Sequence, residues 1–124
     1  MPNMLVVDDE ESICFSMSEY FALHGYEVDS AQERSEAEAL MSQKKYSVVI
    51  QDLCLGGINK TEGIEIIDYV HRQYPETKIV VLTAYGAPEL EAEARRCGAA
   101  AFLHKPKPLS DVAQVIYGMV PANA

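Results

Sequence analysis

The sequence offers little from which a disulfide framework, a zinc site or a membrane span could be built. Its three cysteines, Cys14, Cys54 and Cys97, are widely separated and do not have the spacing of zinc ligands. Its three histidines are equally scattered, and no apolar run approaches the length of a membrane-spanning helix. The N-terminal MPNM lacks the basic start and apolar stretch of a signal peptide. We therefore expect a cytoplasmic protein with reduced thiols and no contact with a membrane.

Basic residues are also scarce. Ten lysines and arginines stand against 19 aspartates and glutamates, which gives a net charge of -9. Direct binding of nucleic acid needs a basic face, so this composition argues against it, whereas a basic partner or a divalent cation remains compatible. The 124 residues, of which 48% are hydrophobic, suit one compact domain over residues 1–124. We expect no output domain in this chain.

Apolar runs alternate with helical patterns along the chain. Five such strand–helix units with short connections predict an α/β fold, a doubly wound five-stranded parallel sheet with helices on both faces. Ligands of such sheets bind at the carboxyl ends of the strands. Strands are expected at residues 4–7, 26–31, 47–50, 78–82 and 99–103, and helices at residues 11–24, 33–41, 64–74, 88–98 and 109–119, the last capped by Ser110.

Charged and hydroxyl side chains stand where four of these strands end. Carboxylates on neighbouring strands form an oxygen cage that suits Mg²⁺, and a carboxylate beside a metal ion can attack phosphorus. An ammonium can neutralise phosphoryl oxygens and a hydroxyl can donate a hydrogen bond to one of them, so the set predicts phosphoryl transfer. The residues are Asp8 and Asp9 in LVVDDEES, Asp52 in IQDLCLGG, Thr83 in VVLTAYG and Lys105 in AFLHKPKP.

These motifs, in this order and at these strand ends, resemble the receiver domains of two-component response regulators over essentially the whole chain. The resemblance implies a flavodoxin-like fold with strand order 2-1-3-4-5. It also implies that a sensor histidine kinase or phosphotransfer protein donates a phosphoryl group to Asp52 in the presence of Mg²⁺. The metal ligands would be Asp9, Asp52 and the backbone carbonyl of Cys54, with Asp8 holding the ion through water. Such a domain is no enzyme beyond catalysing its own phosphorylation and slow self-dephosphorylation.

The resemblance further implies a conformational switch. Thr83 matches the switch hydroxyl, Phe102 the switch aromatic and Lys105 the lysine of the family, and Lys105–Pro106 matches a peptide bond that is commonly cis. On phosphorylation Thr83 would move toward the phosphoryl group and Phe102 would turn inward. The face formed by the helix at 88–98, the following strand and the last helix would then change shape and bind a downstream effector.

The sequence departs from the family's pattern around the site. Gly56 stands where proline is frequent, and the next expected glycine comes only at Gly63, so the loop LCLGGINKTEG is longer than usual. Neither Cys54 nor Tyr85 can orient water as a carboxylate or amide would, and Tyr85 could screen the site. We therefore expect slow self-dephosphorylation. The last helix has no basic residue, which argues against one known dimer type but leaves a monomer or a phosphorylation-promoted homodimer open.

Each residue also has a simpler interpretation. The acids after the first strand could favour a helix start, Asp52 could be a turn residue, Lys105 a solvated charge, Thr83 a helix cap and Phe102 a core residue. Two other functions compete, an aspartyl phosphatase and a phosphorylation-independent interaction module. The phosphatase would need a second acid in place of Cys54, and the module would lack site residues that are all present here. The output and the kinase are not predicted.

Overall fold

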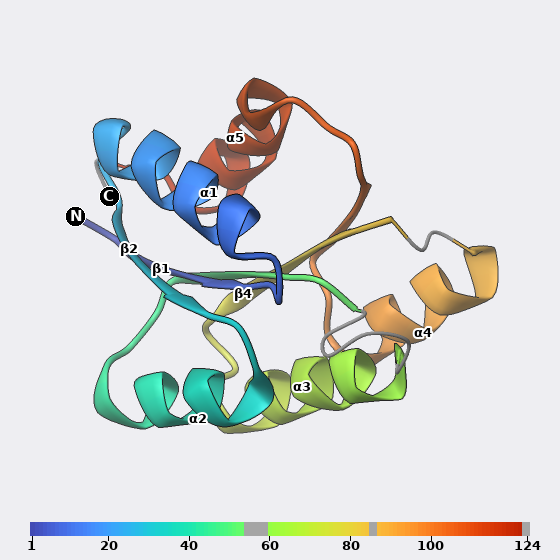
Figure 1. Ribbon diagram of the computed structural model, residues 1–124. Coiled ribbons are helices and arrows are strands. Elements are labelled where there is room, and N and C mark those ends of the chain that lie inside the picture. The colour runs from blue at the N-terminus through green and yellow to red at the C-terminus, as the bar shows by residue number, and fades with distance from the viewer. Residues whose placement is uncertain (54–59, 85–86, 123–124) are drawn as a thin grey trace.

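A doubly wound α/β sheet forms the body of the molecule. The computed structural model describes residues 1–53, 60–84 and 87–122 (Figure 1). Within these residues, strands and helices alternate strictly from one end of the chain to the other, as the sequence predicts. The elements are β1 (Asn3–Val7), α1 (Glu11–Leu23), β2 (Glu27–Ala31), α2 (Arg34–Gln43), β3 (Val48–Gln51), α3 (Lys60–Gln73), β4 (Lys78–Thr83), α4 (Pro88–Cys97), β5 (Ala101–His104) and α5 (Leu109–Met119).

The strands are parallel and lie in the order β2-β1-β3-β4-β5, which confirms the predicted topology. Helices α1 and α5 cover one face of the sheet, and α2, α3 and α4 cover the other (Figure 1). The inner strands are buried on both faces, which explains why their sequences are almost continuously apolar. None of the helices in the described part of the chain has the length and hydrophobicity that crossing a membrane requires.

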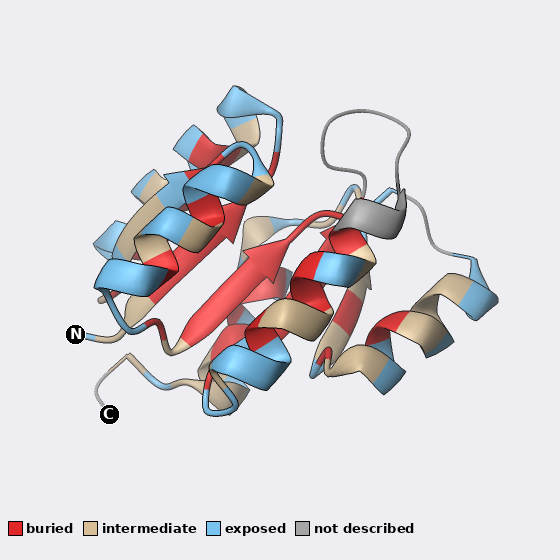
Figure 2. Cartoon of the chain, turned by 90° about the horizontal axis from the view of Figure 1, so that it is seen from below, coloured by how far each residue is buried: buried red, intermediate tan, exposed pale blue. Residues whose placement is uncertain are grey.

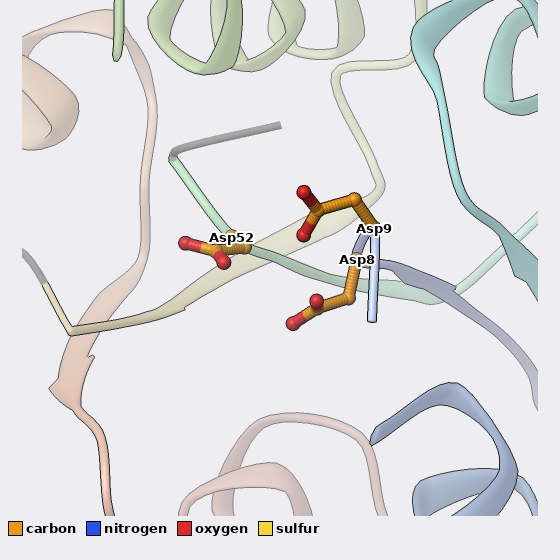
Figure 3. Close-up of side chains that lie close together, drawn as sticks. All are labelled: Asp8, Asp9 and Asp52. Carbon is orange, nitrogen blue, oxygen red and sulfur yellow. The ribbon is translucent and has the colours of Figure 1, made fainter. Parts of the chain in front are cut away.

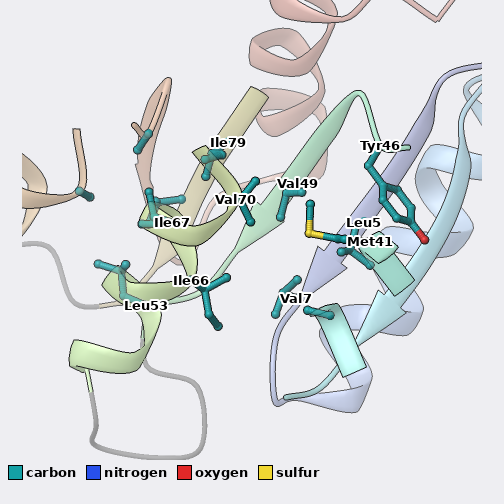
Figure 4. Close-up of a cluster of buried hydrophobic side chains, with 14 of the residues drawn as sticks. Leu5, Val7, Met41, Tyr46, Val49, Leu53, Ile66, Ile67, Val70 and Ile79 are labelled. Carbon is teal, nitrogen blue, oxygen red and sulfur yellow. The ribbon is translucent and has the colours of Figure 1, made fainter. Parts of the chain in front are cut away.

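Each face of the sheet buries its own apolar cluster. Burial is concentrated in the strands and on the sheet-facing sides of the helices, while the outer sides of the helices are exposed (Figure 2). The ends of these buried strands carry the polar residues discussed below. The cluster under α2, α3 and α4 includes Leu5, Val7, Met41, Tyr46, Val49, Leu53, Ile66, Ile67, Val70 and Ile79 (Figure 4).

Several predicted boundaries are wrong by one to a few residues, and one predicted helix cap is wrong. Helix α3 begins at Lys60, inside the segment that the sequence assigned to a loop ending at Gly63. The last strand covers Ala101–His104 instead of residues 99–103. Helix α5 begins at Leu109 after Pro108, and Pro108 occupies the cap position that was assigned to Ser110. The ring of Pro108 restricts φ, which is -57°, and because proline has no polar side-chain atom it forms no capping hydrogen bond.

A hydrogen-bonded carboxylate joins β2 to the segment before β3. The buried Tyr46 hydroxyl donates to Asp29 Oδ2 over 2.6 Å, and Lys44 Nζ donates to the same oxygen over 2.9 Å. The hydrogen bond from Tyr46 is the main reason why the pKa of Asp29 lies below its usual value. Burial and the same hydrogen bond raise the pKa of Tyr46.

Replacing Tyr46 by phenylalanine should therefore lower the free energy of unfolding by about 1 kcal/mol at pH 7, a modest loss because Asp29 is partly exposed. The folded-state pKa of Asp29 is depressed, so its contribution is present above the unfolded-state pKa and is lost as the pH falls through the folded-state pKa. Urea unfolding of Tyr46→Phe and wild-type protein at pH 7 and pH 3 should show the difference shrinking in acid. Tyr117→Phe is the control, and an equal loss at both pH values would contradict the prediction.

Candidate functional site

Three carboxylates meet at the carboxyl-terminal edge of the sheet. Asp8 and Asp9 follow β1, and Asp52 follows β3, the strand beside β1. Because Val7 pairs with Gln51, Asp8 and Asp52 leave the sheet side by side. One carboxylate oxygen from each of the three aspartates lies within 4.8 Å of the others (Figure 3). Asp8 and Asp52 are only 3% and 7% exposed, whereas Asp9 is open to solvent.

The backbone holds these aspartates in place. The amide of Asp8 donates to Ala31 O and the amide of Asp52 donates to Val7 O, both over 3.0 Å, so the sheet pattern continues one residue past each strand. The amide of Glu10 donates to Asp8 Oδ1 over 2.9 Å and fixes the orientation of that carboxylate. The carboxylates are thus positioned by main-chain contacts from neighbouring strands.

Lys105 brings the counter-charge. Its Nζ donates to Asp8 Oδ2 over 2.8 Å and to Asp52 Oδ2 over 3.2 Å. The lysine follows β5, and its backbone amide donates to Thr83 O over 2.8 Å. The Lys105–Pro106 peptide bond is cis, the form that the resemblance implied. The ammonium of a residue that follows the edge strand β5 therefore bridges the carboxylates that follow β1 and β3.

Burial and ion-pair contacts act against each other on Asp8 and Lys105. Burial raises the pKa of the Asp8 carboxyl, and the hydrogen bond and charge of Lys105 oppose this rise only in part. Burial alone would lower the pKa of Lys105, but its contacts with Asp8 and Asp52 outweigh burial and raise it. Because the three clustered carboxylates have beside them one ammonium, which is bonded to Asp8 and Asp52, the cluster is suited to a further cation. Carboxylate oxygens in this number are the ligands that Mg²⁺ prefers.

The two residues assigned to a switch lie on the neighbouring strands. Thr83, the last residue of β4, is fully buried and pairs in register with His104. Phe102 is 6% exposed and belongs to the apolar cluster under α4, where its ring meets the His104 ring edge to face at 5.4 Å. Phe102 therefore already faces inward. Its burial agrees with the simpler interpretation of a core residue and does not test the switch.

Two of the predicted site residues and one departure from the family pattern are not placed. The structure does not describe Cys54, Gly56 or Tyr85. The metal ligand predicted at the carbonyl of Cys54 therefore lies outside the described residues. The sequence interpretation also overlooked Gln51, a fully buried amide next to Asp52. The only sequence signal for it was a polar residue closing an apolar strand.

Comparison with known proteins identifies the family. Residues 4–117 match the family model described as the response regulator receiver domain. The chain belongs to this family. It is thereby placed among response regulators of two-component systems rather than in a class of metabolic enzymes. The flavodoxin-like fold and the predicted family are both confirmed.

Individual relatives of this receiver domain are distant but cover it almost completely. The photosynthetic apparatus regulatory protein RegA of Rhodovulum sulfidophilum is 29% identical over 90% of this chain and 59% of its own length. The beryllofluoride-activated NtrC4 receiver domain dimer is 30% identical, with a TM-score of 0.87 and 100% of both chains covered. A Burkholderia pseudomallei response regulator, solved with a phosphorylated aspartic acid, a calcium ion and citrate, is 27% identical, with a TM-score of 0.85 and 99% and 69% coverage of this chain and that chain. The chain spans between about a fifth and three fifths of the length of the curated relatives it matches.

If the aspartate cluster binds Mg²⁺, the ion should stabilise the folded protein. A tenfold excess of Mg²⁺ over its dissociation constant adds about 1.4 kcal/mol to the free energy of unfolding, which raises the midpoint of thermal unfolding by a few degrees. Asp9→Asn removes one exposed ligand of the cluster and should abolish most of this rise. Glu11→Gln is the matched control, since Glu11 is an exposed carboxylate outside the cluster. Differential scanning fluorimetry with and without MgCl₂ measures the effect, and equal rises in both variants would refute metal binding at Asp9.

Proposed function

We propose that this receiver domain is a phosphorylation-controlled switch in which Asp52 accepts a phosphoryl group from a sensor histidine kinase or a phosphotransfer protein. The observation that carries the proposal is the bridge from Lys105 Nζ to both Asp8 and Asp52, beside a third carboxylate. A buried nucleophile, an adjacent set of metal ligands and a fixed ammonium are the parts that phosphoryl transfer requires.

In the proposed reaction, a carboxylate oxygen of Asp52 attacks phosphorus while the bond from phosphorus to the donor breaks. The product is an acyl phosphate at Asp52, and the donor leaves with the bonding electron pair. Lys105 neutralises the phosphoryl oxygens, for which its place 3.2 Å from Asp52 is suitable. Asp8, Asp9, Asp52 and the carbonyl of Cys54 would hold Mg²⁺, directly or through water. The bound ion would neutralise charge on the transferred group.

The proposed output starts from Thr83 and Phe102. Thr83 would hydrogen-bond the new phosphoryl group, and the resulting shift at the end of β4 would alter the face formed by α4, β5 and α5. That face would engage a downstream effector domain or protein, in the cytoplasm and without direct contact to nucleic acid. A homodimer promoted by phosphorylation is consistent with the dimer named for the activated NtrC4 receiver. The retention of all five polar site residues favours this switch over a phosphorylation-independent module.

The first test is the intact mass of the protein after incubation with acetyl phosphate. One added phosphoryl group is expected with Mg²⁺ and none after Mg²⁺ is chelated. Asp52→Asn should remain unlabelled, whereas Glu11→Gln should label like the wild type. A folded, Mg²⁺-binding wild-type protein that gains no mass from any small donor would instead indicate the phosphorylation-independent module.

We also expect the acyl phosphate to persist. Neither Cys54 nor Tyr85 can orient an attacking water molecule, so loss of the phosphoryl group should be slow once the donor is removed. Cys54→Asn introduces an amide two residues after Asp52 and should accelerate this loss. The decay of the phosphorylated mass with time measures both rates. A wild-type decay as fast as that of Cys54→Asn would show that these positions do not control the lifetime.

A further inference from the structure

A buried amide ties the residue before Asp52 to the first turn of α3. Gln51 is the last residue of β3, is fully buried, and its Nε2 donates to Gly63 O over 2.6 Å. A carbonyl oxygen only accepts, so this contact fixes which end of the amide faces the helix. Gln51 shares a sheet face with Val49, which belongs to the apolar cluster packed against α3 (Figure 4).

The residue after Asp52 touches the same point of α3. A Cβ atom built on Gly63 would collide with the backbone of Leu53, so the first turn of α3 lies directly against that backbone. Leu53 itself is fully buried in the cluster that contains Ile66 and Ile67 (Figure 4). The two neighbours of Asp52 thus make contact with one glycine, and Asp52 is the residue between them.

The chemistry of Gln51 is hard to explain by packing alone. Its Oε1 is buried and accepts no hydrogen bond from any residue that the structure describes. An amide with one unpaired end costs free energy in an apolar cluster, and an apolar side chain of the same shape would avoid that cost. The donor end, in contrast, has a short and specific contact. The amide is therefore best explained by the hydrogen bond from its Nε2 to Gly63 O.

We propose that Gln51 is a positioning residue for Asp52, which clamps the end of β3 against Gly63 so that the phosphoacceptor carboxylate keeps its attacking orientation beside Lys105. The clamp rests on the proposed function, because it matters only if Asp52 reacts. Without the bond to Gly63 O, the strand end and the first turn of α3 can separate. Small displacements of an attacking group reduce reaction rates strongly, even when the fold is intact.

The decisive variant is Gln51→Met, which keeps the volume of the side chain and removes both ends of the amide. We expect the midpoint of urea unfolding to stay near that of the wild type, because the unpaired oxygen is lost together with the donor. The rate constant for labelling by acetyl phosphate at saturating Mg²⁺ should fall about tenfold or more. Amide hydrogen exchange at Asp52 and Leu53 should rise, with β1 and β4 unchanged. Ile50→Val, a conservative change on the opposite face of the same strand, should label at the wild-type rate.

A second variant approaches the same contact from the helix. Gly63→Ala places a Cβ atom against the backbone of Leu53. Because alanine has a higher helix propensity than glycine, a lower labelling rate in this variant cannot come from a weaker helix. If both residues act through one clamp, the double variant should label no more slowly than the slower single variant. Multiplied rate losses, or wild-type labelling of folded Gln51→Met, would overturn the clamp alone. A wild-type protein that takes no label would overturn the proposed function and the clamp with it.

Discussion

The ammonium of Lys105 is the contact on which the arrangement of the site depends. It reaches from the end of β5 to carboxylates that follow β1 and β3, across sequence separations of 97 and 53 residues. Asp8 and Asp52 are almost completely buried, and two ionised carboxylates so close together repel each other unless a cation stands between them. The lysine satisfies part of this requirement. The remaining negative charge, to which the exposed Asp9 contributes, favours a cation over an anion at this edge of the sheet.

The register of the sheet, rather than the attraction between charges, sets the positions of the aspartates. Parallel register places Val7 beside Gln51, so the next residues of both strands emerge at one level, and main-chain hydrogen bonds continue past the strand ends to Asp8 and Asp52. On the other side of Asp52 the close approach of Gly63 to Leu53 brings the first turn of α3 against the strand end. Asp52, the proposed phosphoacceptor, is consequently held by the main chain of β1 and by Lys105, and its neighbour Leu53 lies against α3.

Most of the fold and the core of the site could be predicted from the sequence. The alternation of apolar runs with helical patterns predicted the parallel sheet. Because the carboxyl ends of parallel strands lie at the same edge of a sheet, the sequence also predicted that Asp8, Asp52 and Lys105 lie close together. The features at Gly63 and Gln51 that the sequence did not predict depend on tertiary contacts. Gly63 was interpreted as the end of a loop because it matches the glycine that the family's pattern expects after the acceptor, yet here it lies in α3 and allows the helix to touch Leu53. The role of Gln51 likewise depends on a partner twelve residues away that no local pattern reveals.

Phosphorylation of Asp52 would change the balance of charge around Lys105. An acyl phosphate carries more negative charge than the carboxylate it replaces, and it places that charge farther from the sheet. Lys105 Nζ, now 2.8 Å from Asp8 and 3.2 Å from Asp52, would be drawn toward the phosphoryl oxygens and away from Asp8. The backbone amide of Lys105 donates to Thr83 O, so the residue that carries this ammonium is also bonded to the end of β4. The ends of β4 and β5 precede α4 and α5, so both groups that would respond to charge added at Asp52, Lys105 Nζ and the Thr83 hydroxyl, lie at the ends of the strands that lead into the proposed output face.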